Sequence, residues 1–526
     1  MHAPAELPFA PQLRILCTAA MLCSVGLFVV WSWHWPLVGD ASLIHYICFL
    51  MDHGMAPYRD LGDMNMPGAL LIEWAAMHAL GGGDLAWRIF DFALLLVAAA
   101  AMLEIARPYD WFAGVFAACL FALVHGRDGL VQAGQRDLTM AVLLLLATAF
   151  LFRALRRAQG WPMIAFGLCA GVAATIKPTA LPFDVALFWI AAVGLHRKGL
   201  APSRYIAATS AAFLAAPVAV FLFLWRQHAL AAFEDGLRTV VPYYATLGHR
   251  PISFLLQHCF SPLLPLVLFW IALLGLARPR LTTERVLLLA GATFGLGSYI
   301  LQPRGFPYYR YPLLAFLLPL MAIDFVSALR ATAGRRPQLQ RAFAVAALAV
   351  GGLFIAPVSA LSIHQYEWWN LEFISSLEQN LHTLGGSSLS GSIQCIDSIS
   401  GCGTTLYRMG LVQSTGVLSD FLLFGPDRTP IVHRTRQQFL ASIQSHPPRV
   451  IVVSSWLHVD GPDNYEKLDR WPAFKEYLAS RYELRTEWKP QRMAKWWSRS
   501  EWPKGYRIYL LTNSAGANGP ALLPAQ

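Results

Sequence analysis

The chain has 526 residues, of which 56% are hydrophobic and 14% are charged, and its mean hydropathy is +0.45. This composition excludes an ordinary water-soluble protein, because such proteins are about 25% charged. The net charge of +10 does not indicate nucleic-acid binding, since the basic residues lie mainly in short connections between apolar segments. We therefore expect a polytopic α-helical membrane protein.

Apolar runs of about 16–22 residues, long enough to span a bilayer, alternate with short connections as far as residue 362. Four connections are rich in arginine, at 153–157, 196–204, 278–285 and 330–341. Basic loops stay in the cytoplasm, so we place these four and the N-terminus there. The scheme predicts about eleven transmembrane helices. The external segments are then 34–84, 126–137, 177–181, 226–257, 303–311 and everything after about 363.

The first span, Ile15–Val30, lacks a clear cleavage site after it and is predicted to be a retained signal anchor. Two apolar segments follow in the first external loop. Ala41–Met51 has apolar residues at helical spacing and is expected to lie flat on the membrane. Met66–Leu80 carries Glu73 and His78, and as a span it would move the later arginine clusters outside. We expect it to be an external juxtamembrane helix or a re-entrant segment.

After the last span the composition becomes rich in charged residues, Trp, Ser and Gly, which indicates a soluble α/β domain. A buried strand is predicted at Arg449–Ser454, a helix at Glu466–Arg481 and a half-buried strand at Tyr506–Leu511. The final segment is rich in Gly, Ala and Pro and is expected to be disordered. The predicted parts are a membrane domain at 1–362 with its first external loop at 34–84, an external α/β domain at 363–512, and a tail at 513–526.

Eight cysteines are present, and six of them lie in or beside apolar segments, where packing is the expected role. Cys395 and Cys402 lie in the predicted external domain. They could pair if that domain faces an oxidising compartment, and the sequence alone does not decide this. His45, His53 and His78 match no metal-ligand spacing, so an interfacial role is favoured over a metal site.

Charged and aromatic residues are concentrated in the segments placed outside. A charge at the centre of a span costs about 2.5–3.5 kcal/mol, so this concentration indicates a water-filled cavity or a site among the headgroups. Single residues have simpler explanations, since Asp40 could cap a helix and Lys177 could reach a lipid headgroup. Their occurrence together favours a functional site. The candidates are Asp40, Arg59, Asp60, Asn65, Arg136, Asp137, Lys177, Arg304, Tyr308, Tyr309 and Arg310.

The order of these features resembles the GT-C glycosyltransferases of the family 39 type. Within them the chain is most similar to the bacterial relatives of protein O-mannosyltransferases and to the lipid A aminoarabinose transferases. The resemblance covers about residues 10–362 and, more loosely, the C-terminal domain. It rests on Gly39-Asp40, Tyr58-Arg59-Asp60 to Pro67-Gly68, Ala86-Trp87-Arg88, Gly134-Gln135-Arg136-Asp137, Lys177-Pro178 and Arg304-Gly305-Phe306-Pro307-Tyr308-Tyr309.

The resemblance implies an inverting transfer of a sugar from a polyprenyl-phosphate donor to an acceptor hydroxyl on the periplasmic face. Asp40 is the expected general base. Asp137 is the second catalytic carboxylate and could bind the acceptor or orient Asp40. The mechanism requires no cofactor, although Asp137 could hold an optional divalent ion. The residues expected to bind the donor phosphate are Arg59, Arg136, Lys177, Arg304 and Arg310, and those expected to bind substrate are Asp60, Asn65, Tyr308 and Tyr309.

Two departures from the family pattern bear on the donor more than on the reaction class. Many members have Lys-Pro-Pro where this chain has Asn65-Met66-Pro67-Gly68, so another cation must meet the donor phosphate. Arg59, Lys177 and Arg304 are the candidates. The acidic pair frequent in the family's first loop is also absent, since Ala41 follows Asp40.

Two other classes of function predict different features. A transporter or flippase of lipid-linked sugars or small solutes should carry mid-membrane charges, broken helices or an internal repeat, and the sequence offers little of these. A scaffold that presents the C-terminal domain to an envelope partner should tolerate substitution of Asp40 and Asp137. The expected location is the bacterial inner membrane. Expected partners are the polyprenyl-phosphate-linked sugar, a glycolipid, polysaccharide or protein acceptor, and membrane lipids, but no nucleic acid.

Overall fold

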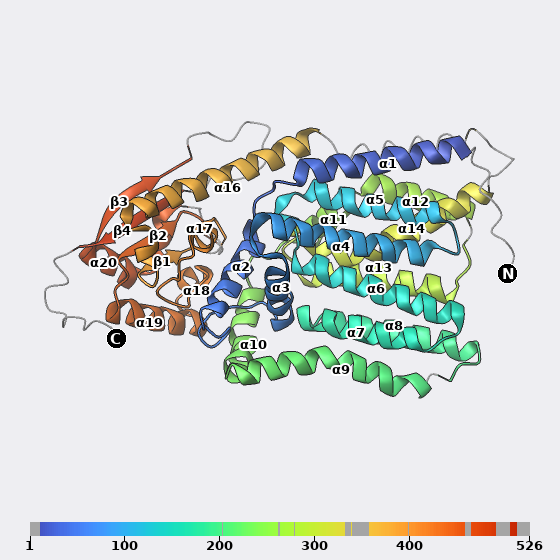
Figure 1. Cartoon of the computed structure of the whole chain (residues 1–526), viewed down its shortest axis with the longest axis horizontal. Helices are drawn as coiled ribbons and strands as arrows, with labels where there is room; N and C mark the ends of the chain where they lie inside the picture. The colour runs from blue at the N-terminus through green and yellow to red at the C-terminus, as the bar shows by residue number, and fades with distance from the viewer. Residues whose placement is uncertain are drawn as a thin grey trace. The chain divides into compact units, whose positions relative to one another are not determined.

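The computed structural model forms two compact units (Figure 1). The residues that the structure describes are 11–201, 203–260, 263–277, 279–331, 338, 357–397, 399–457, 464–490 and 505–512. The helical unit comprises Met1–Pro36, Asn65–Trp225 and His249–Ile363, and the sheet unit comprises Leu37–Met64, Arg226–Gly248 and His364–Gln526. The predicted tail at 513–526 lies outside the described residues.

The helical unit is a bundle of helices that run beside one another (Figure 1). Helix α14 lies at the centre of the bundle, because 94% of its most apolar stretch is buried. The corresponding share for α9 is 6%. Its α-helices are α1 Pro11–Ser32, α3 Pro67–Leu80, α4 Gly83–Ala106, α5 Trp111–Asp128, α6 Arg136–Arg157, α7 Trp161–Ile176, α8 Ala180–Arg197, α9 Ser203–Arg226, α11 Ile252–Phe260, α12 Leu264–Ala277, α13 Thr283–Leu301 and α14 Tyr311–Ala331, with short 3-10 turns at η1 Leu130–Gln132 and η2 Pro307–Arg310.

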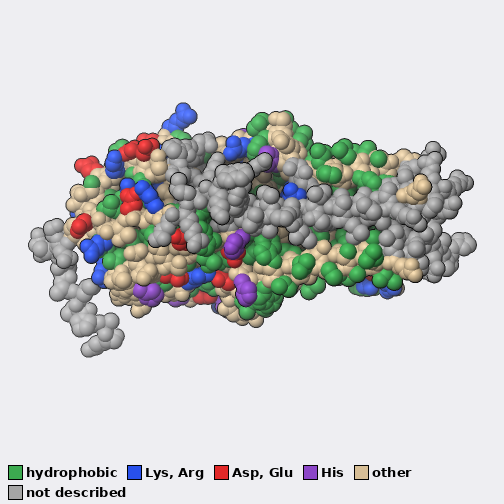
Figure 2. Space-filling model, turned by 90° about the horizontal axis from the view of Figure 1, so that it is seen from above, with side chains coloured by type: hydrophobic (Ala, Val, Ile, Leu, Met, Phe, Trp, Pro, Cys, Tyr) green, Lys and Arg blue, Asp and Glu red, His purple; other side chains and the backbone are tan. Residues whose placement is uncertain are grey.

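Seven helices in the described part of the chain are long and apolar enough to cross a membrane: α1, α4, α6, α8, α9, α13 and α14. An eighth span results if α11 and α12, bent by 80°, are counted as one. Helices α5 and α7 also form where spans were predicted, and the predicted span around Phe343–Ala360 lies largely outside the described residues. Figure 2 shows hydrophobic side chains over the helical unit and many charged ones over the sheet unit. The predicted polytopic helical class is confirmed.

Glycines allow the central helices to approach closely. A Cβ atom at Gly295 of α13 would lie 2.3 Å from the backbone nitrogen of Leu313 in α14. At Gly291, one turn earlier, it would lie 2.3 Å from the ring of Phe316. Small residues four apart permit such backbone contact in bilayers, where burial of apolar surface gives little drive for helix association.

The sheet unit contains a four-stranded sheet in the order β1-β2-β4-β3. Strand β1 is parallel to β2, whereas β4 is antiparallel to both β2 and β3. The predicted strands are present as β2 Val450–Ser454 and β4 Tyr506–Leu511, and β2 is buried along its whole length. The other strands are β1 Ile393–Ile396 and β3 Tyr482–Trp488. The helices of the unit are α2 Gly39–Asp52, α10 Leu230–Ala245, α16 Pro357–Leu384, α17 Cys402–Met409, α18 Phe421–Phe424, α19 Pro430–Ser445 and α20 Pro472–Arg481, with 3-10 turns at η3 Gly386–Leu389 and η4 Tyr465–Arg470.

Two segments from the N-terminal two thirds of the sequence pack into this unit. In α2, the Tyr46 hydroxyl donates to Leu411 O at 3.0 Å and accepts from Gln413 N at 3.0 Å. In α10, Asp235 forms an ion pair with Arg434 at 2.6 Å. The sequence analysis divided the chain once, at residue 362. The sheet unit instead combines two segments from before that position with the residues after it.

Helix α2 corrects one expectation of the sequence analysis. The segment Ala41–Met51 is helical as predicted, but its apolar stripe is not left for lipid. Ile44, Ile47 and Leu50 are at most 3% exposed, because protein covers them, and α2 packs against α17. The hydrophobic stripe of α2 thus marks a core face rather than a membrane-facing one.

Cys395 in β1 and Cys402 at the start of α17 form a disulfide, with their Cα atoms 6.1 Å apart. This spacing is ordinary for such a bond. The pairing that the sequence left open is therefore present, and it fixes the start of α17 to the sheet.

Candidate functional site

The start of α6 carries two candidate residues, Arg136 and Asp137, and a tight loop leads into it. Gly134 in that loop has φ +59°, a region that other L-residues rarely adopt. A Cβ atom there would lie 2.4 Å from the Trp87 ring, whose Nε1 donates to Ala133 O at 3.0 Å. Glycine at 134 therefore lets the loop pass the indole and sets the direction in which α6 begins.

Lys177 lies at the centre of the clearest polar cluster in the helical unit. Its Nζ donates to Asp137 Oδ1 at 2.6 Å and to Gln302 Oε1 at 2.7 Å. The same Nζ lies 4.6 Å from the centre of the Tyr309 ring, within the range of a cation–π contact. Asp137 lies in α6 and Tyr309 in η2, whereas Lys177 and Gln302 directly follow α7 and α13. Parts of four elements therefore meet at one ammonium group.

Asp137 itself is fully buried, at 0% exposure, and lies in the first turn of α6. Its Oδ1 accepts the hydrogen bond from Lys177 Nζ, while its buried Oδ2 has no hydrogen-bond partner within the described residues. The N-terminus of a helix favours a negative charge, which offsets part of the cost of burying this carboxylate. Gln135 is the N-cap of α6, so Asp137 does not cap this helix.

Arg136, the residue directly before Asp137, belongs to a second polar feature. Its Nη1 donates to Asn65 Oδ1. A small pocket with an empty volume of about 240 Å³ lies beside it, and the buried carboxylate Glu73 also lines that pocket. The complete lining is Ala69, Ile72, Glu73, Trp87, Phe90, Gly134, Arg136, Thr139 and Ile176.

The segment between α13 and α14 carries four more candidates. Arg304 is half-buried, while Tyr308 and Tyr309 are buried in η2. Arg310 is 4% exposed and forms an ion pair with Asp128, and its Nη1 also donates to His258 O at 3.3 Å. The charge of Arg310 is thus already compensated inside the protein.

The remaining candidates, Asp40, Arg59 and Asp60, belong to the sheet unit. Asp40 is half-buried in the first turn of α2, whose N-cap is Val38, so Asp40 is not that cap either. Arg59 holds Asp60 in a bidentate ion pair, with Nη2–Oδ2 at 2.7 Å and Nε–Oδ1 at 2.9 Å. The hydrogen bond from Arg59 lowers the pKa of the Asp60 carboxyl below its usual value. Arg59 Nη1 also donates to Gln227 O at 3.0 Å.

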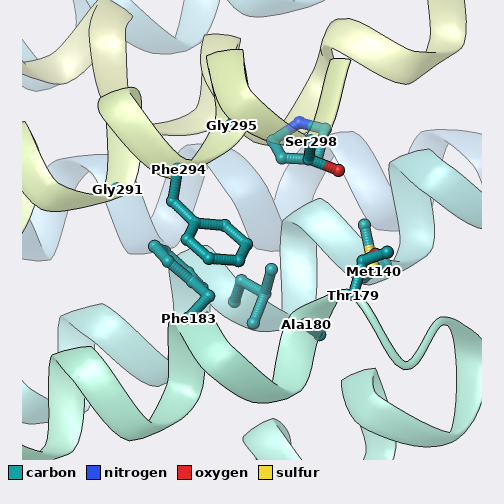
Figure 3. A pocket seen from close by; sticks show the side chains of 10 residues that line it. Met140, Thr179, Ala180, Phe183, Gly291, Phe294, Gly295 and Ser298 are labelled. Carbon is teal, nitrogen blue, oxygen red and sulfur yellow. The ribbon is translucent and has the colours of Figure 1, made fainter. Parts of the chain in front are cut away.

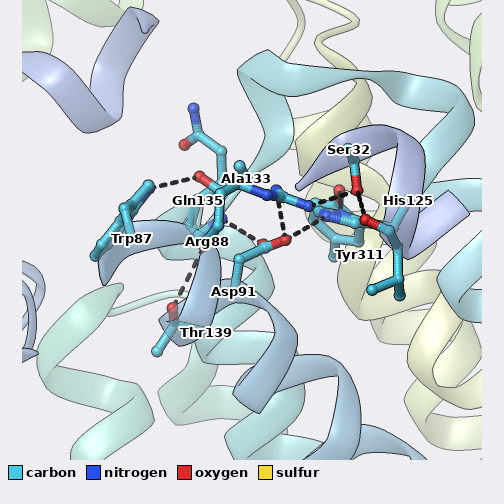
Figure 4. A network of polar contacts seen from close by, with 11 residues as sticks. Ser32, Trp87, Arg88, Asp91, His125, Ala133, Gln135, Thr139 and Tyr311 are labelled. Atoms are coloured by element: carbon cyan, nitrogen blue, oxygen red, sulfur yellow. Dashed lines mark hydrogen bonds and ion pairs between the residues drawn. The ribbon is translucent and has the colours of Figure 1, made fainter. Parts of the chain in front are cut away.

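Sequence reasoning missed a buried polar network around Asp91 of α4 (Figure 4). Arg88 Nη1 donates to Asp91 Oδ2 at 2.9 Å, and His125 Nε2 lies 3.1 Å from the same oxygen. Gly134 N donates to the other oxygen, Oδ1, at 2.6 Å. A signal was available, because an arginine and an aspartate spaced i, i+3 in an apolar span are expensive unless paired.

A second pocket, with an empty volume of about 220 Å³, is mainly apolar, and the rings of Phe183 and Phe294 point into it (Figure 3). Ser298 lies at its edge, and its Oγ and O accept from Gln302 Nε2 at 3.3 and 3.1 Å. These bonds fix the amide of Gln302 so that its Oε1 faces Lys177.

Within the part of the chain that the structure describes, no group of three or more His, Cys, Asp or Glu residues is arranged to hold a metal ion.

Comparisons with known proteins agree with this architecture. Residues 65–221 match the family model described as dolichyl-phosphate-mannose-protein mannosyltransferase, a stretch that contains Arg136, Asp137 and Lys177. The fold is similar to the crystal structure of ArnT from Cupriavidus metallidurans bound to undecaprenyl phosphate. The TM-score is 0.59 at 14% identity, covering 97% of this chain and 100% of that chain.

An oligosaccharyltransferase from Archaeoglobus fulgidus, tethered to an acceptor peptide, gives a TM-score of 0.48 at 14% identity, covering 85% of this chain and 70% of that chain. A comparison with curated protein sequences finds no significant match.

The fold and the family-model match define the class as a multi-span membrane protein with a small appended sheet. The family-model match to residues 65–221 and the ArnT-like fold both agree with the resemblance to GT-C membrane glycosyltransferases that the sequence motifs indicated.

Proposed function

We propose that the protein transfers a sugar from a polyprenyl-phosphate donor to an acceptor hydroxyl, with inversion of the anomeric carbon. The reaction is assigned to the external face of a bacterial inner membrane, with the N-terminus in the cytoplasm. The match of residues 65–221 to a mannosyltransferase family and the likeness to a fold that binds undecaprenyl phosphate in ArnT support this proposal.

The single observation that carries the proposal is the Lys177 cluster. The sugar leaves behind a polyprenyl monophosphate, which gains negative charge as the bond to C1 breaks. A cation that is already oriented stabilises such a charge at little cost in reorganisation. Lys177 is oriented by Asp137 and Gln302, and Arg136 follows directly from the Gly134 loop. We assign donor-phosphate binding to Lys177 and Arg136.

The geometry separates the other proposed phosphate ligands into two kinds. Arg310 is compensated by Asp128 and Arg59 by Asp60, so both are better suited to holding their segments than to meeting a phosphate. Arg304 is half-buried on the segment that leads to Tyr309 and is retained as a third phosphate ligand. Asn65 accepts a hydrogen bond from Arg136, so its proposed role is to orient that guanidinium group.

In the proposed step the acceptor oxygen attacks C1 of the sugar from the face opposite the phosphate. The C1–O bond to the phosphate breaks, and its electron pair leaves with the polyprenyl phosphate. A hydroxyl is a poor nucleophile at neutral pH, so a carboxylate must take its proton during the attack. Asp40 is assigned this role. Asp137 is assigned to holding Lys177, and a divalent ion is not required because the leaving group is a monophosphate.

The test uses purified protein in lipid with a radiolabelled polyprenyl-phosphate sugar and measures release of free polyprenyl phosphate. Wild type is expected to release it. Asp40→Asn should bind the donor but lose release by about 10²–10⁴-fold, the usual contribution of a general base. Asp52→Asn is the matched control, since it makes the same change at the exposed last residue of the same helix, α2.

The outcomes separate the classes of function. Equal release by Asp40→Asn and wild type would remove Asp40 as the base. Donor movement across the bilayer without release by any variant would indicate a flippase instead. Absence of donor binding by wild type would contradict the proposal as a whole.

A further inference from the structure

The buried network around Asp91 is not used by the proposed chemistry, yet it is unusually complete. Its side chains come from α1, α4, α5 and α14, and none is more than 1% exposed. Besides the contacts of Asp91 already given, Arg88 Nη2 donates to Ser32 Oγ at 3.0 Å. His125 Nδ1 lies 2.6 Å from the Tyr311 hydroxyl.

The direction of the bonds follows from the groups present. A carboxylate only accepts, so His125 Nε2–H and Arg88 donate to Asp91. The second nitrogen of a neutral imidazole then accepts, and the Tyr311 hydroxyl donates to it. The chain Tyr311–His125–Asp91–Gly134 N is therefore continuous, and every member has a partner (Figure 4).

The two ends of this hydrogen-bonded chain fall on two of the segments that form the Lys177 cluster, the start of α6 and the segment 307–311. Gly134 stands two residues before Arg136 and three before Asp137. Tyr311 stands two residues after Tyr309, whose ring contacts Lys177. The last turn of α5 contacts the segment 307–311 at two points. His125 meets the Tyr311 hydroxyl, and Asp128 forms an ion pair with Arg310.

Burying these charged groups costs desolvation free energy. Apolar side chains would hold the helices together without that cost. Buried ion pairs in general give little net stability compared with apolar residues of similar size. Their best-attested use is to select one arrangement among several, because a partly satisfied network is strongly disfavoured. Here the arrangement selected is the relative position of the Gly134 loop and the segment 307–311.

We propose that Asp91 is a positioning residue that locks the start of α6 to the segment before α14 and so preforms the donor-phosphate site. The inference rests on the proposed function. Because Asp91 is fully buried, it acts only through the Gly134 amide and His125, not by touching substrate.

The first test is independent of activity. Asp91→Asn keeps the size of the side chain and an oxygen for the Gly134 amide, but its nitrogen cannot accept from Arg88 or His125. Hydrogen exchange should become faster in peptides from both segments, 130–138 and 305–312. The control is Asp324→Asn, which breaks a comparable buried pair with Arg285 in the same unit without contacting either segment. Exchange that changes in only one segment, or equally in the control, would overturn the coupling.

The second test joins the network to catalysis. Misplacing a binding group by about 1 Å can lower turnover by roughly 100-fold, and we expect a loss of this order for Asp91→Asn. Combined with Arg136→Gln, the losses should be non-additive, because Asp91 acts through the loop that carries Arg136. Asp324→Asn combined with Arg136→Gln should be additive.

A gentler variant covers the case in which Asp91→Asn does not fold. Tyr311→Phe removes only the hydroxyl that meets His125, and its turnover loss should be non-additive with that of Lys177→Gln. Additive losses in both cycles would overturn the inference. If wild type shows no sugar transfer while exchange still links the two segments, the proposed function fails and the coupling stands.

Discussion

Replacing Lys177 by glutamine tests the phosphate site most sharply, because the residue combines charge with fixed geometry. Its Nζ is held by Asp137 and Gln302 at 2.6 and 2.7 Å, so the ammonium group is already placed before a ligand arrives. Glutamine keeps much of the side chain's reach and its polarity but carries no charge. The prediction is weaker binding of undecaprenyl phosphate with little change in the fold of the bundle.

The magnitude follows from the bond that is lost. A hydrogen bond to a charged group contributes about 1.5–3 kcal/mol. Since about 1.4 kcal/mol corresponds to a tenfold change, Kd should rise roughly 10- to 150-fold. Part of any loss could come from Asp137, which Lys177→Gln leaves buried without its ion-pair partner. The double variant Lys177→Gln/Asp137→Asn removes that charge and isolates the effect on the ligand.

The assay is a binding titration of undecaprenyl phosphate with protein in lipid nanodiscs, accompanied by thermal unfolding of each variant. The expected result is weak binding by both the single and the double variant. Lys177→Arg should keep part of the affinity, because the charge remains while the compact ammonium geometry is lost. Wild-type affinity in Lys177→Gln, or its full recovery in the double variant, would refute the assignment of Lys177 to the phosphate.

Three further outcomes follow from particular contacts. Gly134→Ala should reduce turnover at least tenfold, measured by polyprenyl phosphate release, because its Cβ would lie 2.4 Å from the Trp87 ring at a positive φ; unchanged turnover would contradict this. Lys467→Met should destabilise the sheet unit by roughly 3–5 kcal/mol in thermal unfolding, since it removes the lysine that pairs with the buried Asp420, and adding Asp420→Leu should recover most of that loss. Reduction of the disulfide should lower stability by about 2–3 kcal/mol, and an unchanged melting temperature in reductant would argue against a closed bond.

The fold class was predictable because membrane spans are a strong signal. Long apolar runs separated by arginine-rich connections leave few alternatives in a bilayer. Strands β2 and β4 were predictable for a similar reason, since a run such as Val450–Val453 must be buried. Strand β3 was missed because Glu483, Arg485 and Glu487 leave few apolar residues, and its burial pattern is mostly exposed.

Local patterns did not predict which surfaces would meet. The apolar stripe of α2 looks the same whether lipid or protein covers it, and its partner Leu411 lies 365 residues away. Periodicity records that a face is buried but not by what. The expectation that this stripe faces lipid was wrong for that reason.

The candidate site was predictable in part. The Lys177–Asp137 pair joins residues 40 positions apart, and both were selected only because they lie in segments placed on one side of the membrane. Their contact with Gln302 and Tyr309 needed the structure, as did the ion pair that engages Arg310. Asp91 was not among the candidates, although its i, i+3 spacing from Arg88 was visible.

The most direct test of the central claim is a structure of the protein in lipid with undecaprenyl phosphate bound. We expect phosphate density within hydrogen-bonding distance of Lys177 and Arg136, at the junction of the α6 start and the α7 end. Phosphate bound elsewhere, with the Lys177 cluster unchanged and untouched, would contradict it.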